Sequence, residues 1–200
     1  NSKLKVRRYP GPSQFKTEQK NIFFGRNDDI ERLFDTILDR KIVTLFSKSG
    51  LGKSSLLQAG IIPKFKELKL ENKTLKFTPI NIRFTAYSGS KSISPLNETI
   101  RSIEKDYPIK SSYLHKIIPD DRSIWFFLKQ QQRQYINRNN FVLIFDHFEE
   151  LFTYPEQQIK QFKILLKEGI DSQIPEDYRF ELDVLESTTP STLNKKDLEC

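Results

Sequence analysis

Residues 46–55 read FSKSGLGKSS, and the elements expected on either side of them decide the fold. The run KIVTLF at 41–46 predicts a buried strand, and residues 54–65 predict a helix with Leu56, Leu57 and Ile61 at helical spacing. A glycine-rich turn between a strand and a helix is typical of a phosphate-binding loop. Its successive backbone amides and the helix N-terminus behind it both favour negative charge.

The loop departs from the usual pattern G-x-x-x-x-G-K-[ST] at one position, where Ser47 replaces the first glycine. We expect Lys53 to reach the β- and γ-phosphates and the Ser54 hydroxyl to hold Mg²⁺. The alternative is a solvated Gly/Ser loop with a chance lysine, but the flanking strand and helix favour nucleotide. The expected binding residues are Ser47, Lys48, Ser49, Gly50, Leu51, Gly52, Lys53, Ser54 and Ser55.

A second apolar run, FVLIF at 141–145, predicts a buried strand that ends in Asp146. Ligands sit outside the carboxyl ends of parallel strands, so Asp146 is the expected second Mg²⁺ ligand, directly or through water. Glu149 or Glu150 could polarise the attacking water, and we expect Glu150→Gln to trap bound ATP more than Glu149→Gln does. The alternative is a strand that simply runs into an acidic surface. His147 is expected to pack or support this site and not to bind metal.

Three motifs in order resemble the STAND NTPases (signal-transduction ATPases with numerous domains), in particular their novel STAND bacterial branch. The first comprises YPGPSQF at 9–15 and IFFGRNDDIERL at 22–33, and the second is SKSGLGKSSLLQAGIIP at 47–63. The third is VLIFDHFEELF at 142–152, which resembles the acidic motif of that branch. Together the motifs cover the chain up to about residue 154.

The resemblance implies a switch that binds ATP or ADP, whose nucleotide state controls opening and self-association, with sensing and output in further domains of the polypeptide. It also implies that Phe24, Gly25 and Arg26 line the base side of the pocket, and that the base is adenine. From the residues alone, Gly25 permits a tight turn and Arg26 could pair with a phosphate or an acid. The alternative places Phe24 in the core and Arg26 on the surface.

We therefore expect an α/β chain with the three-layer P-loop NTPase fold and a mainly parallel sheet. Helices are predicted at 28–40, from Ser94-Pro95 to 106, at 123–139 and at 156–168, the last stopped by Gly169, with a strand within 75–84. The expected divisions are an extended lead-in at 1–21, the NTPase core at 22–168 and a polar tail or insertion at 169–200. Residues 178–184 in that tail alternate between apolar and charged, which predicts an exposed edge strand or a hairpin. We expect the domain to be truncated here. As a switch of the kind that the resemblance implies, it is expected to hydrolyse ATP slowly or conditionally.

Composition sets limits on the partners. Lysine and arginine number 33 against 26 acids, for a net charge of +7, which suits polyanionic partners including nucleotide and nucleic acid. The basic residues are widely spread, so a nucleic-acid-coupled ATPase is an alternative function, as is a nucleotide-binding scaffold without hydrolysis. The single cysteine, Cys200, fits a reducing cytoplasm. No apolar run approaches membrane-spanning length, so no membrane partner is expected.

Overall fold

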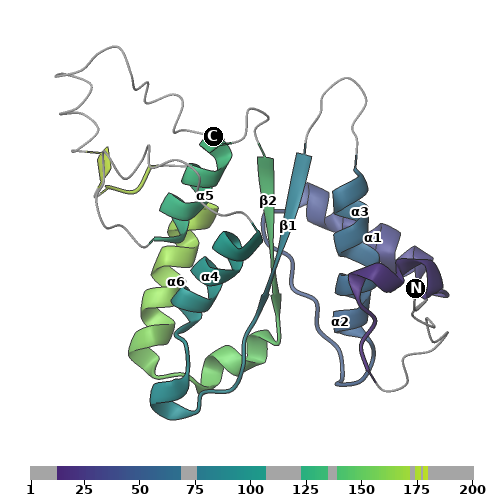
Figure 1. Cartoon of the computed structure of the whole chain (residues 1–200), viewed down its shortest axis with the longest axis horizontal. Helices are drawn as coiled ribbons and strands as arrows, with labels where there is room; N and C mark the ends of the chain where they lie inside the picture. The colour runs from purple at the N-terminus through teal and green to yellow at the C-terminus, as the bar shows by residue number, and fades with distance from the viewer. Residues whose placement is uncertain are drawn as a thin grey trace, which may run out of the picture. The chain divides into compact units, whose positions relative to one another are not determined.

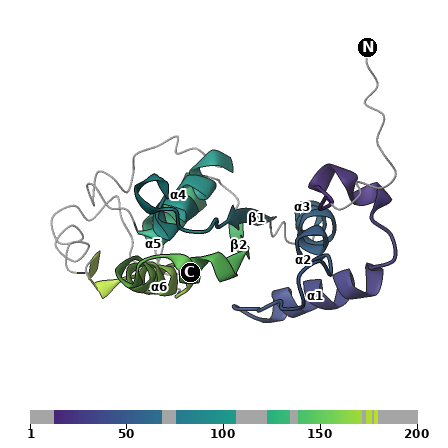
Figure 2. The same ribbon diagram turned by 90° about the horizontal axis from the view of Figure 1, so that it is seen from below.

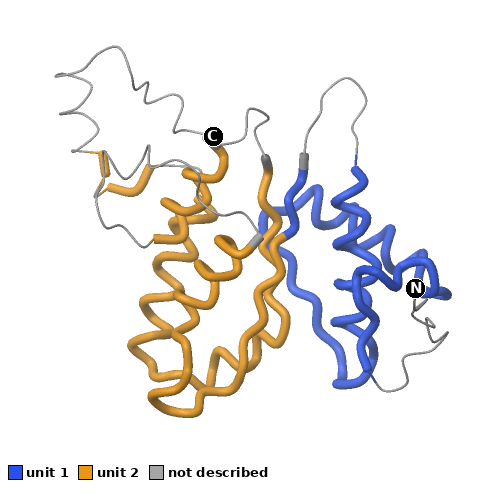
Figure 3. Tube along the Cα trace, in the orientation of Figure 1, with its two compact units in different colours: residues 1–79 blue, residues 80–200 orange. Residues whose placement is uncertain are grey.

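A computed structural model describes residues 13–68, 76–106, 123–134, 139–171, 174–176 and 178–179. The chain divides into two compact units, Asn1–Pro79 and Ile80–Cys200, which Figure 3 shows in different colours. Each unit has its own helices and its own apolar contacts, and each is described by itself below.

The first unit is mainly helical (Figure 1). A 3₁₀ helix, η1, spans Thr17–Ile22, where the sequence predicted extended chain, and α1 spans Asn27–Asp39. The helix predicted after the phosphate loop is confirmed as three consecutive segments. These are α2 at Lys53–Ser55, the π-helical segment η2 at Leu56–Ile61 and α3 at Ile62–Glu67.

Aromatic rings form the centre of the first unit. Phe34 of α1 lies against Phe65 of α3, with ring centroids 4.7 Å apart, and Phe65 lies 5.5 Å from Phe77. Phe34 is the one buried residue of α1. Helical spacing predicts that Leu38 also faces inward, but its side chain is exposed. The sequence favours Asn27 as the N-cap, but Arg26 occupies that position and Asn27 is the first residue of the helix. The predicted helix is thus correct in extent but buries a narrower face.

The predicted buried strand before the phosphate loop is the main departure in this unit. Residues 42–48 have no regular secondary structure and pair with no strand among the described residues. Ile42 is 68% exposed and Phe46 is 84% exposed, so the prediction of a buried strand at 41–46 is wrong for the structure as described. The pattern of β-branched and aromatic residues is right for a strand, but a strand forms only where a partner supplies the hydrogen bonds.

The described strands are β1 at Lys76–Arg83 and β2 at Asn139–Asp146, which run parallel as a two-stranded sheet. The boundary between the units falls within β1. Both strands were predicted, and the α/β class is confirmed. The expected larger parallel sheet is not found among the described strands.

The described α-helices of the second unit are α4 at Pro95–Asp106, α5 at Ile124–Gln134 and α6 at Glu156–Ile170. All three lie to one side of the strands in Figure 1, and the turned view of Figure 2 shows the same grouping. Ser94 caps α4 as predicted, because its Oγ accepts a hydrogen bond of 3.2 Å from the Asn97 amide. Two short 3₁₀ helices, η3 at Gly89–Lys91 and η5 at Phe148–Thr153, follow the strands.

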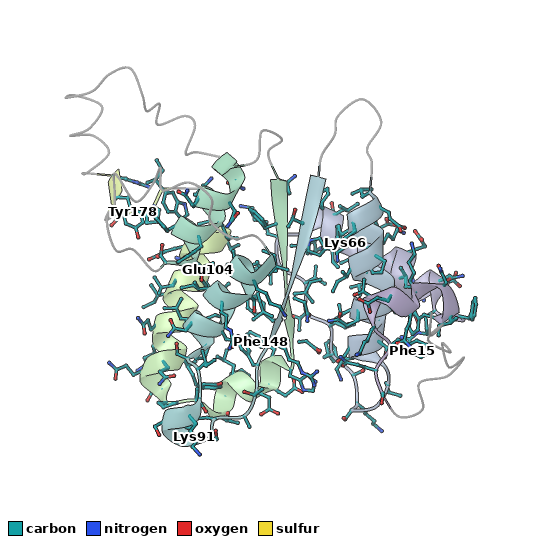
Figure 4. All side chains as sticks on the ribbon, in the orientation of Figure 1. Phe15, Lys66, Lys91, Glu104, Phe148 and Tyr178 are labelled. Atoms are coloured by element: carbon teal, nitrogen blue, oxygen red, sulfur yellow. The ribbon has the colours of Figure 1, made fainter. Side chains whose placement is uncertain are left out.

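The core of this unit joins the strands to the three helices. Its fully buried members are Ile80, Ile82, Phe84, Ile103, Ile124, Trp125, Phe126, Leu151 and Phe162. Trp125, Phe126 and Phe127 all lie in this core, as their sequence of three large aromatic residues predicts. Tyr178 stacks on Trp125 with centroids 5.2 Å apart, and Figure 4 labels it.

Several local predictions in the second unit are wrong. The glutamines at positions 130, 131, 132 and 134 predict an exposed helix face, but Gln130 and Gln131 are fully buried. Helix α6 was predicted to stop at Gly169, but this residue is helical and the helix ends at Ile170. Tyr178 and Arg179 are helical where an edge strand was predicted, and the rest of that prediction, 180–184, lies outside the described residues, as do 107–122 and 135–138.

Candidate functional site

The loop at 47–52 has the backbone that a glycine-rich phosphate loop requires. Gly50 and Gly52 have φ angles of +82° and +77°, the left-handed region that side chains disfavour. Gly52 is the N-cap of α2, and its carbonyl accepts the Leu56 amide at 2.8 Å. The two glycines turn the preceding segment into the helix within a few residues.

Lys53, the first residue of α2, folds back over this loop. Its Nζ donates to the Ser47 carbonyl oxygen at 2.8 Å and to the Lys48 carbonyl oxygen at 3.4 Å. The start of the loop is therefore hydrogen-bonded to the lysine that directly follows the loop. To bind a phosphate chain, the Lys53 ammonium group would have to exchange these carbonyl acceptors for phosphate oxygens. Both contacts are at exposed positions, so this exchange costs little free energy.

The loop also offers donors. Among the residues that the structure describes, the amides of Ser49, Gly50 and Gly52 donate to no acceptor, whereas the Leu51 amide makes a long contact of 3.5 Å with the Lys48 carbonyl. A Cβ placed on Gly50 would meet nothing within 4 Å, so space lies beside the backbone there. Unused amides, open space and a nearby ammonium group fit a phosphate chain.

Arg26 connects the start of α1 to the loop. Its Nη1 donates to the Leu51 carbonyl oxygen at 3.3 Å, and its Nε donates to Asp29 Oδ2 at 2.5 Å. Asp29 also accepts from Arg32 at 3.1 Å. The hydrogen bond from Arg26, helped by Arg32, lowers the pKa of the Asp29 carboxyl below its usual value. The sequence analysis proposed Arg26 but missed Asp29. Asp29 lies about one helical turn after Arg26, and this spacing could have predicted the ion pair.

The other two residues predicted for the base side behave differently. Gly25 has a φ of +81° and so makes the predicted tight turn. Phe24 is 77% exposed, which contradicts the alternative that placed it in the core. A pocket of about 240 Å³ opens beside Arg26, lined also by Asp29, Arg32, Leu33, Thr36, Leu45 and Leu56. The residues at 47–55 do not line this pocket, so within the first unit it adjoins the loop without including it.

Ser55 has a structural contact that the sequence did not reveal. Its Oγ accepts the amide of Phe15 at 3.1 Å, and the residue is nearly buried. Phe15 in turn lies 5.2 Å from Phe23, measured between ring centroids. The segment before η1 is thereby attached to the helix that follows the loop. This use of the Ser55 hydroxyl differs from the predicted contact with nucleotide.

In the second unit, Asp146 ends β2 as predicted. It is 6% exposed; its carbonyl accepts the Phe84 amide at 3.2 Å, and its Oδ1 accepts the His147 amide at 3.1 Å. The first contact extends the pairing of the strands beyond Arg83, and the second fixes the carboxylate against the turn that follows. The buried carboxylate therefore has a defined place at the carboxyl end of the strand.

His147 changes the direction of the chain after β2. It has φ 57° and ψ 42°, the left-handed conformation, and it is the one described residue other than glycine with a positive φ. Its carbonyl accepts the Glu150 amide at 3.0 Å, which starts η5. Figure 4 labels Phe148, the first residue of η5, near the carboxyl ends of the strands. Glu149 is exposed and Glu150 half-buried in that first turn.

Arg83, at the end of β1, is the functional candidate that sequence reasoning missed. Its Nη2 lies 3.2 Å from His147 Nε2, and His147 Nδ1 lies 3.9 Å from Glu149 Oε1. The sequence contained the information needed to propose it. Arg83 lies at the end of one predicted strand and Asp146 at the end of another, and the carboxyl ends of parallel strands lie at the same edge of a sheet.

Two negative findings concern the described part of the chain. No group of three or more Asp, Glu, His or Cys side chains there converges as a metal site. No helix in those same ranges is long and apolar enough to cross a membrane.

Comparison with known families decides the identity of the domain. The family model described as Novel STAND NTPase 1 matches residues 9–182. The chain belongs to this family. The match includes the loop at 47–53, Arg26, Asp146 and both glutamates, and the resemblance inferred from the three motifs is therefore confirmed. No curated protein and no solved structure matches the chain.

Membership in the novel STAND NTPases establishes the coarse function of this domain. A protein of this family binds nucleotides and is built into a multidomain polypeptide, and a divalent metal ion is the usual companion of the nucleotide. The residues named above fit that chemistry. The loop provides amides and an ammonium group for phosphates, and hydroxyl and carboxylate oxygens are ligands that Mg²⁺ accepts.

Proposed function

We propose that this domain is a regulatory switch that binds ATP or ADP and hydrolyses ATP slowly or conditionally, within a larger signalling or defence protein. The observation that carries the proposal is the loop at 47–53. It combines two left-handed glycines, three amides that donate to no described acceptor, and Lys53 held on loop carbonyls. These groups match a phosphate chain in charge and hydrogen-bonding type.

In this proposal the amides of the loop hold the phosphate oxygens, and Lys53 moves from the Ser47 carbonyl to the β- and γ-phosphates. Gly25 and Arg26 lie toward the base or ribose, with adenine as the expected base. The contact between Arg26 and Leu51 supports this arrangement, because it attaches the start of α1 to the loop. The complete domain is expected to have the three-layer P-loop fold, with 47–54 as its Walker A motif and 141–146 as its Walker B motif.

Ser54 and Asp146 are the proposed Mg²⁺ ligands, and the ion would neutralise charge on the β- and γ-phosphates. Glu149 or Glu150 would accept a proton from the water that attacks the γ-phosphorus, as the bond to the β-phosphate oxygen breaks. Substituting each ligand alone, and then both together, tests whether they act on one ion. If they do, the double variant loses little more affinity than either single variant.

A switch must distinguish its two nucleotides, because a ligand shifts an equilibrium only by its differential affinity for the two states. Calorimetric titration with Mg·ATP and Mg·ADP tests this directly. We expect different affinities for the two nucleotides and a loss of at least about tenfold in Lys53→Ala. Lys48→Ala is the matched control, since the loop uses the main chain of Lys48 and its side chain is exposed.

Equal affinity for both nucleotides, or no binding, would overturn the switch. Adding duplex DNA to a turnover assay separates this function from a nucleic-acid-coupled ATPase, which predicts stimulated turnover and strongly salt-dependent DNA binding. Self-association can be followed by light scattering with either nucleotide bound. A mass that depends on which nucleotide is present supports the proposed control of assembly.

A further inference from the structure

The side chains of Arg83, His147 and Glu149 form a chain of three groups at the carboxyl ends of β1 and β2. Arg83 Nη2 is 3.2 Å from His147 Nε2, and His147 Nδ1 is 3.9 Å from Glu149 Oε1. The register of the strands brings them together, because the Phe84 amide bonds to the Asp146 carbonyl and so sets Arg83 beside the turn at His147. All three residues belong to the second unit.

The guanidinium group decides the state of the imidazole. Arginine carries donors and no acceptor, so the hydrogen bond from Arg83 requires a lone pair on His147 Nε2. The proton of the neutral ring then lies on Nδ1, and this nitrogen is the one that faces Glu149. A positively charged ring would instead point an N–H at the guanidinium group, and the two cations would repel each other.

The left-handed turn at His147 matters to the same geometry. With φ 57° and ψ 42°, this residue starts η5 directly after the strand, and Glu149 follows two residues later in the first turn. Glu149 has no other side-chain contact among the described residues, and its side chain is 73% exposed. A shortening of about 1 Å would make its contact with Nδ1 a hydrogen bond of ordinary length. The ring is therefore placed to orient an otherwise free carboxylate.

Glu150 occupies a different environment. Its main-chain amide donates to the His147 carbonyl at 3.0 Å, and its main-chain carbonyl accepts from Thr153 Oγ1 at 2.7 Å. The structure gives no contact between the Glu150 carboxylate and His147. Glu150 thus builds the turn through its backbone, whereas Glu149 offers its side chain to the histidine.

We propose that Arg83 and His147 are positioning residues for Glu149, with Arg83 fixing the Nδ1–H tautomer of His147 and the ring orienting the Glu149 carboxylate toward the attacking water. This assignment rests on the proposed ATP hydrolysis for the role of Glu149. It also reverses the expectation that Glu150 is the more important of the two glutamates. The tautomer and its dependence on Arg83 stand on the contacts of the second unit alone.

The exposed position of these groups makes a clean test possible. Surface contacts of this kind contribute about 1 kcal/mol or less to stability, so variants at Arg83 and Glu149 should remain folded. The protein contains two histidines, His115 and His147, and a His115→Gln variant assigns the ring signals. Side-chain ¹⁵N–¹H correlation spectra then report which ring nitrogen carries the proton without any nucleotide present.

We expect His147 to carry its proton on Nδ1 in the wild type. Arg83→Met should move the ring toward the Nε2–H form that predominates in free imidazole, whereas Arg83→Lys should retain part of the wild-type pattern. Glu149→Gln should shift the Nδ1 signal, and Glu150→Gln should leave it unchanged. Arg101→Met is the control for loss of a positive charge, since Arg101 lies exposed on α4.

Kinetics supply the second readout. Arg83→Met should lower kcat for ATP by about tenfold and change nucleotide affinity by less than about twofold, because a positioning residue acts on the chemical step. A wild-type ring protonated on Nε2, or a spectrum indifferent to Arg83→Met, would overturn the proposal. A normal kcat in Arg83→Met would refute the role in water activation. If the wild type binds nucleotide but never hydrolyses it, the proposed hydrolysis fails, and the spectra still decide whether the three-residue contact exists.

Discussion

Gly60 and Ile30 are so closely packed that no larger residue fits at position 60. A Cβ built on Gly60 would lie 2.7 Å from Ile30 Cγ1 and 2.8 Å from Ile30 Cδ1. Gly60 belongs to the π-helical segment η2, and Ile30 belongs to α1. The helix after the phosphate loop is thereby held against the helix that carries Arg26.

Gly60→Ala should therefore destabilise the protein. The helical propensity of alanine favours the substitution by up to about 1 kcal/mol, but overpacking costs about 1–3 kcal/mol, and the overpacking should dominate. Urea denaturation monitored by circular dichroism measures the difference. The expected result is a lower midpoint with an unchanged slope.

The double variant Gly60→Ala/Ile30→Ala provides the internal control. Removing the isoleucine side chain takes away the atoms that the new Cβ would meet, so the two changes should be strongly non-additive. If Gly60→Ala has the same effect with and without Ile30, the close contact is not the source of the destabilisation.

The pairing of Asp29 with Arg26 gives a prediction about protonation. Arg26 and, to a smaller extent, Arg32 lower the pKa of the Asp29 carboxyl below its usual value. A carboxyl whose pKa is lower in the folded state stabilises the fold above its unfolded pKa, and this contribution disappears as the pH falls through the folded pKa. The pair should therefore be intact at neutral pH and break only in acid.

Carbon-13 titration of the aspartate side chains measures this directly. We expect Arg26→Gln to raise the pKa of Asp29 more than Arg32→Gln does, because the Arg26 hydrogen bond is the largest cause of the shift. A larger effect from Arg32→Gln would show that Arg26 is not the main partner. Asp29→Asn, which removes the carboxylate partner of Arg26, should change nucleotide affinity if Arg26 contacts the nucleotide.

The sequence predicted the elements whose pattern depends on local chemistry. Apolar spacing indicated α1 and α6, and the capping serine and the proline that follows it indicated α4. Alternation and uninterrupted apolar runs indicated β1 and β2. In each case the residues that form the element also determine its periodicity, so a single sequence is sufficient.

The wrong predictions concern features that depend on contacts between residues far apart in the sequence. The run at 41–46 has the composition of a strand, yet its hydrogen bonds require a partner that the run itself does not specify. Gln130 and Gln131 are polar but fully buried, because α5 lies within the core of the second unit and packs against both α4 and α6. Gly169 was expected to end α6, but it continues the helix at a place where Ile124 leaves room for no Cβ.

The candidate site divides along the same line. The loop glycines, Lys53 and Asp146 could be proposed from motifs, because the motifs fix their spacing. Asp29 and Arg83 contact other side chains of the candidate site, and no motif marks them. Their partners became visible only when helix α1 and the two strands had defined positions.

The left-handed turn at His147 should limit which residues this position accepts. A φ of 57° is accessible to asparagine, which visits this region readily, but it is a strong outlier for a β-branched side chain. We expect His147→Val to destabilise the protein by about 1–2 kcal/mol more than His147→Asn does. Both variants remove the imidazole, so their difference isolates the backbone effect, and equal unfolding midpoints would contradict it.

Gly50→Ala should separate backbone strain from ligand binding. Gly50 has a φ of +82° and Gly89, outside the loop, has a φ of +80°, and an added Cβ would meet nothing within 4 Å at either position. The strain in the two alanine variants should therefore be similar, at about 1–2 kcal/mol.

Because the Gly50 amide is one of the proposed phosphate donors, any relaxation of the strained backbone would also turn that amide. We expect Gly50→Ala to weaken Mg·ATP binding in calorimetry and Gly89→Ala to leave it unchanged. Equal affinities in the two variants would mean that the backbone at Gly50 takes no part in holding the phosphates.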